Sequence, residues 1–312
     1  MRKITSIFEI LDEIQFVLLD QFGVLHDGRR PYPHAIAAVE QLHAAGKQVL
    51  VLSNSSRRSG GTIGKLAKMG FREEWFAGAI TSGELTHRYL SSRPSPWWQQ
   101  LGRRCLHFTW SSRGAISLEG LDLQVVDDPA QADFILAHGT EALALPGGGS
   151  RDMSLDEMQA LLQQCAQQPD RQLPMVVANP DLVTVDGASL ITMPGTLARF
   201  YQQQGGAVQL MGKPDPIIYS AAQELLPAAA AAADPQQWLA IGDSLEHDVA
   251  GAVQAGVKTL FVVGGIHAEA LQLQGSAAEG CTSSSSWSNE ALQQLCQQHQ
   301  LQPDFCMAYL QK

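Results

Sequence analysis

The sequence predicts an α/β fold built on a doubly wound parallel sheet. Two observations predict it: short, almost wholly apolar segments recur along the chain, and helical patterns separate them. Apolar runs of this length are typical of strands that are buried on both faces of a sheet. Their alternation with helices indicates right-handed crossovers between parallel strands. A length of 312 residues favours two domains, or one large domain with an insertion.

The order of the elements follows from the same pattern. The expected strands are 16–19, 49–52, 134–137, 175–178, 208–211, 238–241 and 259–263. The expected helices are 34–45, 59–69, 156–167, 216–226, 246–255 and, near the end of the chain, 289–298. Gly46, Gly70 and Gly256 each follow a helical segment and predict a left-handed residue that ends it. The low-complexity segments 228–233 and 283–286 predict a solvent-facing linker and a loop.

The composition is that of a soluble globular protein, with 45% hydrophobic and 17% charged residues. A net charge of −10 argues against nucleic acid as a partner, because phosphate-binding surfaces gather Lys and Arg. No run approaches the ~20 apolar residues of a membrane helix, so no membrane partner is expected and the predicted location is cytoplasmic. The five cysteines form no C-x-x-C pair, which indicates neither a disulfide framework nor a zinc site.

Polar side chains that suit catalysis follow two early strands. Asp20 ends the first strand, and Ser53, Asn54 and Ser55 end the second. In open α/β sheets ligands bind outside the carboxyl ends of the strands, so Asp20 lies where chemistry is expected. Hydroxyl and amide side chains in front of a helix cap it, and the free backbone N–H groups there also bind anions.

Two later segments supply a cation and a pair of acids. Lys213 follows a strand and Gly212, and a lysine there can neutralise an anion. Asp243 and Asp248 follow another strand, and clustered carboxylates suit Mg²⁺, a hard cation that prefers oxygen ligands. Each segment alone has an ordinary structural explanation, as a cap, a surface lysine or an exposed helix acid. Their co-occurrence at the ends of core strands favours one shared site.

In this order the four segments resemble the motifs of the haloacid dehalogenase (HAD) superfamily of hydrolases. The resemblance is to subclass IIA in particular, the group of sugar-phosphate, nitrophenyl-phosphate and pyridoxal-phosphate phosphatases. It is carried by Gly-Val-Leu-His-Asp-Gly at 23–28, Ser-Asn-Ser at 53–55, Asn-Pro-Asp at 179–181 and Gly-Lys-Pro at 212–214. It covers about residues 14–266, and its motifs are specific as a set.

The resemblance implies a Rossmann-like core with an α/β cap inserted between the second and third motifs. On this basis we expect the catalytic core at 1–81 and 207–312 and the substrate-selecting cap at 82–206, with a cap strand near 105–108. Members of the subclass are often dimers through the cap, so the resemblance, though not the sequence itself, suggests a homodimer.

The resemblance also implies the chemistry. Asp20 would be the nucleophile and would form an aspartyl-phosphate intermediate that water then hydrolyses. Ser53 and the backbone N–H groups of Asn54 and Ser55 would bind the phosphoryl oxygens. Lys213 would neutralise charge on the nucleophile and on the phosphoryl group. The implied function is a phosphohydrolase that acts on a small phosphorylated metabolite.

A Mg²⁺ ion belongs to this picture. The resemblance implies that Asp20, Asp243 and the backbone carbonyl of Phe22 hold it. Asp248 would be an outer ligand through water, or would orient Lys213. Without a cation the three acids would repel a phosphate dianion.

Phe22 departs from the family pattern. Phosphatases of the family carry a second Asp two residues after the nucleophile, which protonates the leaving oxygen and later activates water. A phenyl ring can do neither, and the loss of a general acid typically costs about 10²- to 10⁴-fold in rate. His26 and Asp27 are the nearest replacements, although a turn-stabilising role is favoured for both.

Three interpretations therefore remain open. The favoured one is a phosphohydrolase with weak or unusual acid/base assistance. The next is a catalytically weak phospho-ligand binding or regulatory protein, and the least favoured is a dehalogenase, in which halide leaves without a proton. Arg57 and Arg58, just after the second motif, could meet a second anionic group on the substrate or be solvated first-turn residues.

Overall fold

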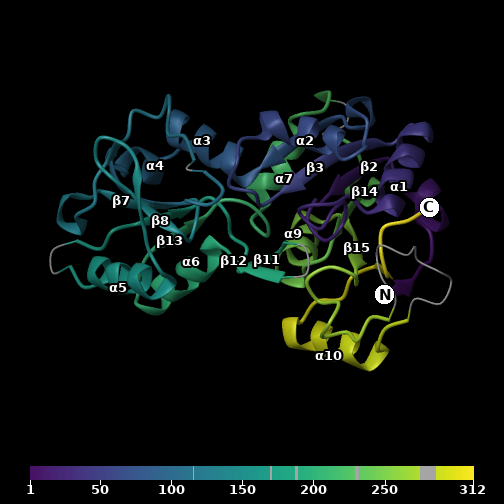
Figure 1. Ribbon diagram of the computed structural model, residues 1–312. Helices are drawn as coiled ribbons and strands as arrows, with labels where there is room; N and C mark the ends of the chain where they lie inside the picture. Colours follow the sequence, from purple (N-terminus) through teal and green to yellow (C-terminus); the bar gives the residue numbers. More distant parts are fainter. Residues whose placement is uncertain (115, 169–170, 187–188, 229–231, 275–285) are drawn as a thin grey trace.

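The chain folds into two neighbouring β-sheets, each with its own helices (Figure 1). The computed structural model describes residues 1–312 except 115, 169–170, 187–188, 229–231 and 275–285. Half of the predicted linker 228–233, and all but the last residue of the predicted loop 283–286, therefore lie outside the described residues. Among the described residues, no helix is long and apolar enough to cross a lipid bilayer.

The first sheet contains seven strands in the order β1-β16-β15-β14-β2-β3-β4. Their bounds are β1 (Arg2–Lys3), β2 (Phe16–Leu19), β3 (Gln48–Ser53), β4 (Gly78–Thr81), β14 (Trp238–Gly242), β15 (Lys258–Val262) and β16 (Phe305–Met307). Every neighbouring pair is parallel. The predicted fold class, a parallel α/β core, is confirmed.

Helices cover both faces of this sheet because its strands are apolar on both sides. Side chains alternate along a strand, so Val17 and Leu19 pack in one core cluster with α1 (Pro33–Ala44) and α2 (Thr62–Lys68). Leu18 packs in the cluster on the opposite face. The helices there are α3 (Ser82–Ser92), α7 (Pro216–Gln223) and α9 (Ala250–Ala255). A last helix, α10 (Asn289–His299), packs beside β15 and β16.

The second sheet is built from the middle of the chain. It runs in the order β13-β10-β7-β5-β8-β9, with β6 also paired to β5. The bounds are β5 (Arg104–Thr109), β6 (Gln124–Val125), β7 (Phe134–Ala137), β8 (Ala142–Ala144), β9 (Ser150–Asp152), β10 (Met175–Val177) and β13 (Val208–Leu210). The strands β5, β7, β10 and β13 are parallel, whereas β8 and β9 are antiparallel. Because β13 pairs with β10, the second sheet extends a few residues past position 206.

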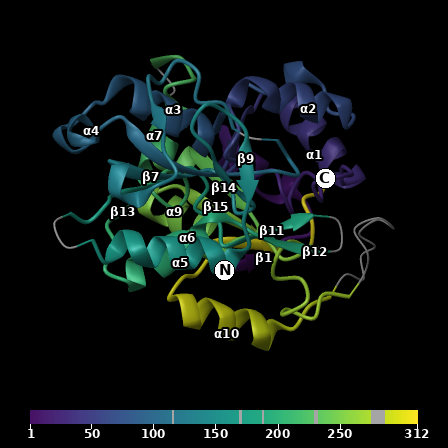
Figure 2. The same ribbon diagram turned by 60° about the vertical axis from the view of Figure 1, so that its left-hand side comes forward.

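The second sheet is held against the first by shared apolar packing. Helices α5 (Leu155–Ala166) and α6 (Pro194–Gln203) cover one of its faces. Residues of the other face, such as Cys105 and Phe134, join the same apolar cluster as α3 and α7, and α4 (Pro96–Gln100) packs there through Trp98. A hairpin of β11 (Val183–Asp186) and β12 (Ser189–Thr192) projects from this part of the chain toward the first sheet (Figure 2).

Short helices complete the structure. They are η1 (Ile7–Glu13), η2 (Ser59–Gly61), η3 (Glu73–Trp75), η4 (Pro129–Gln131), η5 (Pro235–Gln237) and the π-helix η6 (Leu245–Val249). The predicted helix 59–69 is thus η2 followed by α2, and the predicted helix 246–255 opens as η6 before it continues as α9.

Candidate active site

Three adjacent strands carry the predicted catalytic residues to one edge of the first sheet. Asp20 follows β2, Ser53 ends β3 and Asp243 follows β14, and β2 lies between the other two. Because the strands are parallel, their carboxyl ends meet at the same edge. Lys213 and Asp248 reach this edge from the turn before α7 and from η6.

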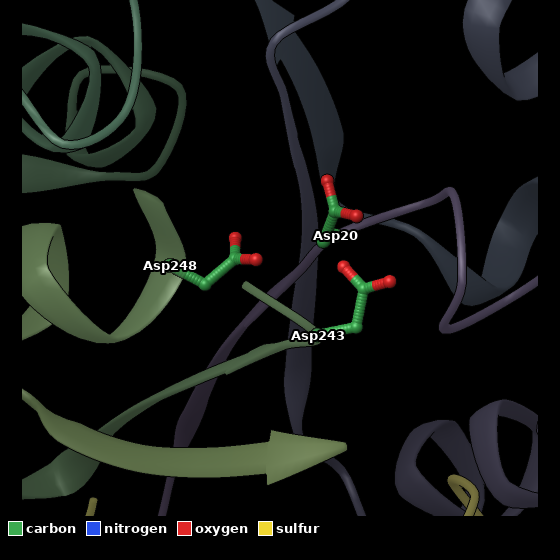
Figure 3. A group of neighbouring side chains, drawn as sticks. All are labelled: Asp20, Asp243 and Asp248. Atoms are coloured by element: carbon green, nitrogen blue, oxygen red, sulfur yellow. The ribbon is translucent and has the colours of Figure 1, made fainter. Parts of the chain in front are cut away.

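Lys213 lies between two carboxylates. Its Nζ donates to Asp20 Oδ1 and to Asp248 Oδ1, each at 2.6 Å, and to the backbone carbonyl of Leu52 at 3.1 Å. All three side chains are buried, with Lys213 only 3% exposed. Asp243 completes the group: Asp20, Asp243 and Asp248 each offer an oxygen within 4.8 Å of the others (Figure 3).

The buried charges in this group do not balance. Burial raises the pKa of Asp20 to about 7, an effect that Lys213 opposes, and burial together with Asp20 and Asp248 raises the pKa of Asp243 well above its usual range. Burial disfavours the ammonium form of Lys213, but Asp20 and Asp248 outweigh it and raise the pKa of Lys213 well above normal. Three acids thus share one cation, and a divalent cation would neutralise the excess. The donor set of carboxylate oxygens fits a hard metal ion.

Two glycines leave the space that the Asp243 carboxylate occupies. A Cβ on Gly23 or on Gly265 would lie 1.9 Å from Asp243 Oδ2, so only glycine leaves room for the carboxylate. Gly23 also has φ +78°, in the left-handed region. The N–H of Ile266 donates to the same oxygen at 2.9 Å.

Asp248 orients the lysine. One of its oxygens accepts from Lys213, and the other accepts from the N–H of Ser244 at 3.0 Å, which fixes the carboxylate on η6. Of the two roles expected for Asp248, this arrangement favours the orientation of Lys213.

Asn54 joins the segments around the lysine. Its Oδ1 accepts from the N–H of Lys213 at 2.7 Å and from Ser82 Oγ at 3.2 Å. Its Nδ2 donates to the carbonyl of Lys213 at 3.0 Å and to Asp181 Oδ1 at 2.7 Å. Gly212 precedes the lysine with φ +137°, where a Cβ would meet Ser82 Oγ at 2.0 Å. The side chain of Asn54 therefore has a positioning role that its place in the motif did not indicate.

Ser53 and Ser55 form a tight turn after β3. The N–H of Ser55 donates to Ser53 Oγ at 3.2 Å, so this N–H serves the turn in the structure. Both residues line the cavity, together with Asn54.

A cavity of about 470 Å³ opens over the acids and the lysine. The first sheet and its loops supply one wall, and the middle segment supplies the other through residues such as Trp110, Asp181 and Met193. This volume suits a small molecule.

Phe22 lies on the cavity wall and brings no acid to it. Its ring packs against His26 at 4.7 Å between centroids, and Lys65 Nζ lies 5.6 Å from the centre of the Phe22 ring. Burial lowers the pKa of His26 to about 4, and its Nδ1 accepts from the N–H of Gly28. Asp27 Oδ1 accepts from two backbone N–H groups of the following turn. Both His26 and Asp27 thus stabilise the turn.

The sequence did not single out several residues that line the cavity. Asp181 accepts from Asn54 and lies 3.7 Å from His247 Nε2, while Lys65 and Arg113 lie on the cavity wall. Asp181 belongs to the Asn-Pro-Asp segment of the family resemblance, which was its only signal. The others come from a helix face and a loop with no local motif.

Comparisons with known proteins point to one family of hydrolases. The family described as haloacid dehalogenase-like hydrolase matches residues 17–122, and a second family, described as HAD-hydrolase-like, matches residues 210–280. Chronophin from Homo sapiens is 26% identical over 266 residues, which cover 83% of this chain and 84% of chronophin.

Solved structures give the same result. A hydrolase of the haloacid dehalogenase-like family from Brucella suis 1330 superposes with a TM-score of 0.75 at 26% identity, over 98% of this chain and 99% of that one. A p-nitrophenyl phosphatase from Archaeoglobus fulgidus superposes with a TM-score of 0.62 at 20% identity, over 95% and 97% of the two chains. The second likeness concerns the fold alone.

Proposed function

This chain belongs to the haloacid dehalogenase-like hydrolases, and from that premise we propose that it is a Mg²⁺-dependent phosphohydrolase acting on a small phosphorylated metabolite. The observation that carries the proposal is the buried group of Asp20, Lys213, Asp243 and Asp248 at the carboxyl edge of the sheet. The matching family models and the 26% identical hydrolase from Brucella suis 1330 support a hydrolytic reaction at this group.

Asp20 is the proposed nucleophile. One carboxylate oxygen attacks phosphorus, the bond from phosphorus to the leaving oxygen breaks, and an aspartyl-phosphate forms, which water then hydrolyses. The hydrogen bond from Lys213 holds the Asp20 carboxylate in one orientation and offsets the charge that gathers on the phosphoryl oxygens. Ser53 Oγ and the N–H groups of Asn54 and Ser55 are the proposed phosphoryl ligands, Ser55 releasing its bond to Ser53 when the phosphate binds.

Asp20, Asp243 and the backbone carbonyl of Phe22 are the proposed ligands of the cation, with Asp248 behind Lys213. When bound, Mg²⁺ supplies positive charge that lets a phosphate dianion approach three carboxylates. The excess of buried negative charge in the site supports this assignment.

The second domain would act as the cap. We propose residues 82–206 as this cap and residues 1–81 and 207–312 as the core, with β13 joining the cap sheet where the chain returns. The cap contributes one wall of the cavity, so its side chains select the substrate. A homodimer through the cap and a cytoplasmic location remain proposals from the family resemblance.

Phe22 supports a substrate with a good leaving group, such as an acyl or aryl phosphate, which needs little protonation. The same residue supports a second candidate, a phospho-ligand binding protein of low turnover. A dehalogenase is less favoured, because the acids that suit a metal are kept and the cap is built on a β-sheet.

Phosphate release over a panel of alkyl, aryl and acyl phosphates tests the proposal. We expect release that needs Mg²⁺, favours aryl and acyl esters, and falls by at least about 10³-fold in Asp20→Asn. A matched control is Asp12→Asn, an exposed acid in η1 that does not line the cavity. If the whole panel stays intact while phosphate still binds, the binding-protein candidate replaces the enzyme. Release that Asp20→Asn does not reduce would contradict Asp20 as nucleophile.

A further inference from the structure

The cavity has a second charged region besides the acidic centre. Four basic side chains line it apart from Lys213 and His247, namely Arg57, Arg58, Lys65 and Arg113. Arg58 is committed to Glu84, with two hydrogen bonds of 2.7 and 3.1 Å. The other three form a group of cations that we call the basic rim (Arg57, Lys65 and Arg113).

The three cations of the basic rim have fewer carboxylates beside them than are needed to balance their charge. Among the described residues, neither Arg57 nor Lys65 has a carboxylate within ion-pair distance. Arg113 lies 3.5 Å from Asp186, but that acid is already shared with Arg29 at 2.9 Å. One carboxylate therefore faces several cations. Burial lowers the pKa of Lys65, and the nearby charges of Arg57 and Arg113 lower it further.

The rim is held in place from both domains. The Arg57 guanidinium donates to the carbonyl of Arg113, which ties the loop after β3 to the middle segment. The Arg113 guanidinium lies 5.1 Å from the centre of the Trp110 ring, and Trp110 Nε1 donates to Ser56 Oγ at 3.2 Å. Like charges are kept together by these contacts, at a cost in Coulomb repulsion that a bound anion would remove.

The rim is also near the reaction centre. Lys65 Nζ lies 5.6 Å from the centre of the Phe22 ring, and Phe22 is two residues beyond Asp20. A ligand whose phosphate lies at Asp20 and Ser53 can thus place another group against the rim within the same cavity of about 470 Å³.

From this arrangement we infer that the substrate carries a second anionic group, a carboxylate or a second phosphate, which binds Arg57, Lys65 and Arg113 while its phosphomonoester lies at Asp20. The inference rests on the proposed function and adds to it the substrate class. It also assigns Lys65 and Arg113, which no motif indicated, to substrate recognition.

A matched series of esters tests this inference. The probes are phenyl phosphates that carry an ω-carboxyalkyl chain of two to six carbons, their ω-carboxamide counterparts and the counterparts in which a second phosphate replaces the carboxylate. The carboxamides keep size and leaving group but lack the second charge. We expect kcat/KM for the best charged probe to exceed that of its carboxamide about tenfold or more, and the carboxylate and bisphosphate arms identify which anion fits.

Single substitutions in the basic rim show which residues produce the preference for the charged probe. Lys65→Met and Arg57→Gln are each expected to reduce the ratio of charged to carboxamide kcat/KM about three- to tenfold. Lys68→Met is the control, because Lys68 is an exposed lysine on the same helix and does not line the cavity. It is expected to keep the ratio of the unaltered protein.

A binding measurement distinguishes failure of this inference from failure of the proposed function. Calorimetry with Asp20→Asn measures the affinity for the charged probe and its carboxamide without turnover. A preference in binding with no hydrolysis by the unaltered protein would overturn the proposed hydrolase and keep the rim. If carboxamide and charged probes are hydrolysed at equal kcat/KM, the role of the basic rim is overturned and the proposed hydrolase stands. The same holds if Lys68→Met lowers the ratio as much as Lys65→Met does.

Discussion

Replacing Asn54 by alanine is expected to destabilise the protein far more than its size suggests. The side chain is 2% exposed and its two polar atoms take part in four hydrogen bonds, two of them with the backbone of Lys213. A neutral hydrogen bond contributes about 1 kcal/mol and a bond to a charged group such as Asp181 about 2 kcal/mol. Alanine also leaves the N–H of Lys213 buried without a partner. The free energy of unfolding should therefore fall by about 3–5 kcal/mol.

Urea unfolding followed by tryptophan fluorescence measures this change. Asn289→Ala removes the same amide from an exposed position and is expected to change stability by less than about 0.5 kcal/mol. A loss below about 1 kcal/mol in Asn54→Ala, with the same dependence on urea concentration as the unaltered protein, would refute the role assigned to Asn54.

Three further predictions concern the acid, the metal and pH. Phe22→Asp should raise phosphate release from an alkyl ester in Mg²⁺ by at least about tenfold, since a general acid is commonly worth about 10²–10⁴; no gain in a variant whose urea midpoint is normal would count against the assignment. Mg²⁺ at about a hundred times its Kd should add about 2.7 kcal/mol to the free energy of unfolding. Asp243→Asn should abolish most of that gain, and a gain that persists would place the ion elsewhere. Burial lowers the pKa of His107 to about 4, from an ordinary 6.5, so the unfolded chain binds more protons between these values and stability falls as pH drops from 6.5 to 4. Between pH 7 and pH 5 that single group accounts for about 2 kcal/mol of the fall, and His107→Leu should flatten the pH dependence by a similar amount in urea unfolding at pH 7, 6 and 5; an unchanged slope would contradict it.

The central strands were predictable because burial on both faces leaves a continuous apolar run. The expected strand 16–19 coincides with β2, and 134–137 coincides with β7. The short strands β1, β8 and β9 gave no such signal: β1 and β9 are exposed, two- and three-residue strands at sheet edges. β1 pairs with β16 near the other end of the chain, whereas β9 pairs with the neighbouring β8. The sequence placed 208–211 correctly as a strand, but its partner β10 in the second sheet follows only from three-dimensional packing.

The candidate site was predictable to the extent that its residues end core strands. Asp20, Ser53 and Asp243 could be placed at one edge because parallel strands share their carboxyl ends. Lys65 and Arg113 could not, because a helix face and a loop of the middle segment come to the cavity only through tertiary folding. Nor could the bonds of the Asn54 side chain be foreseen, since their partners are 28 to 159 residues away.

The hydrogen bonds of Asn54 also connect the opening of the cavity to the position of Lys213. The chain leaves the first sheet at Ser82 and returns to it just before Lys213, and both residues are hydrogen-bonded to this one amide. Asp181, on the far wall of the cavity, is bonded to it as well. A rotation of the second domain that widens the cavity must therefore strain the same bonds that hold Lys213 against Asp20. If the chain acts as proposed, such a rotation would leave Lys213 poorly placed, and Asp20 would be fully activated only after the second domain had returned.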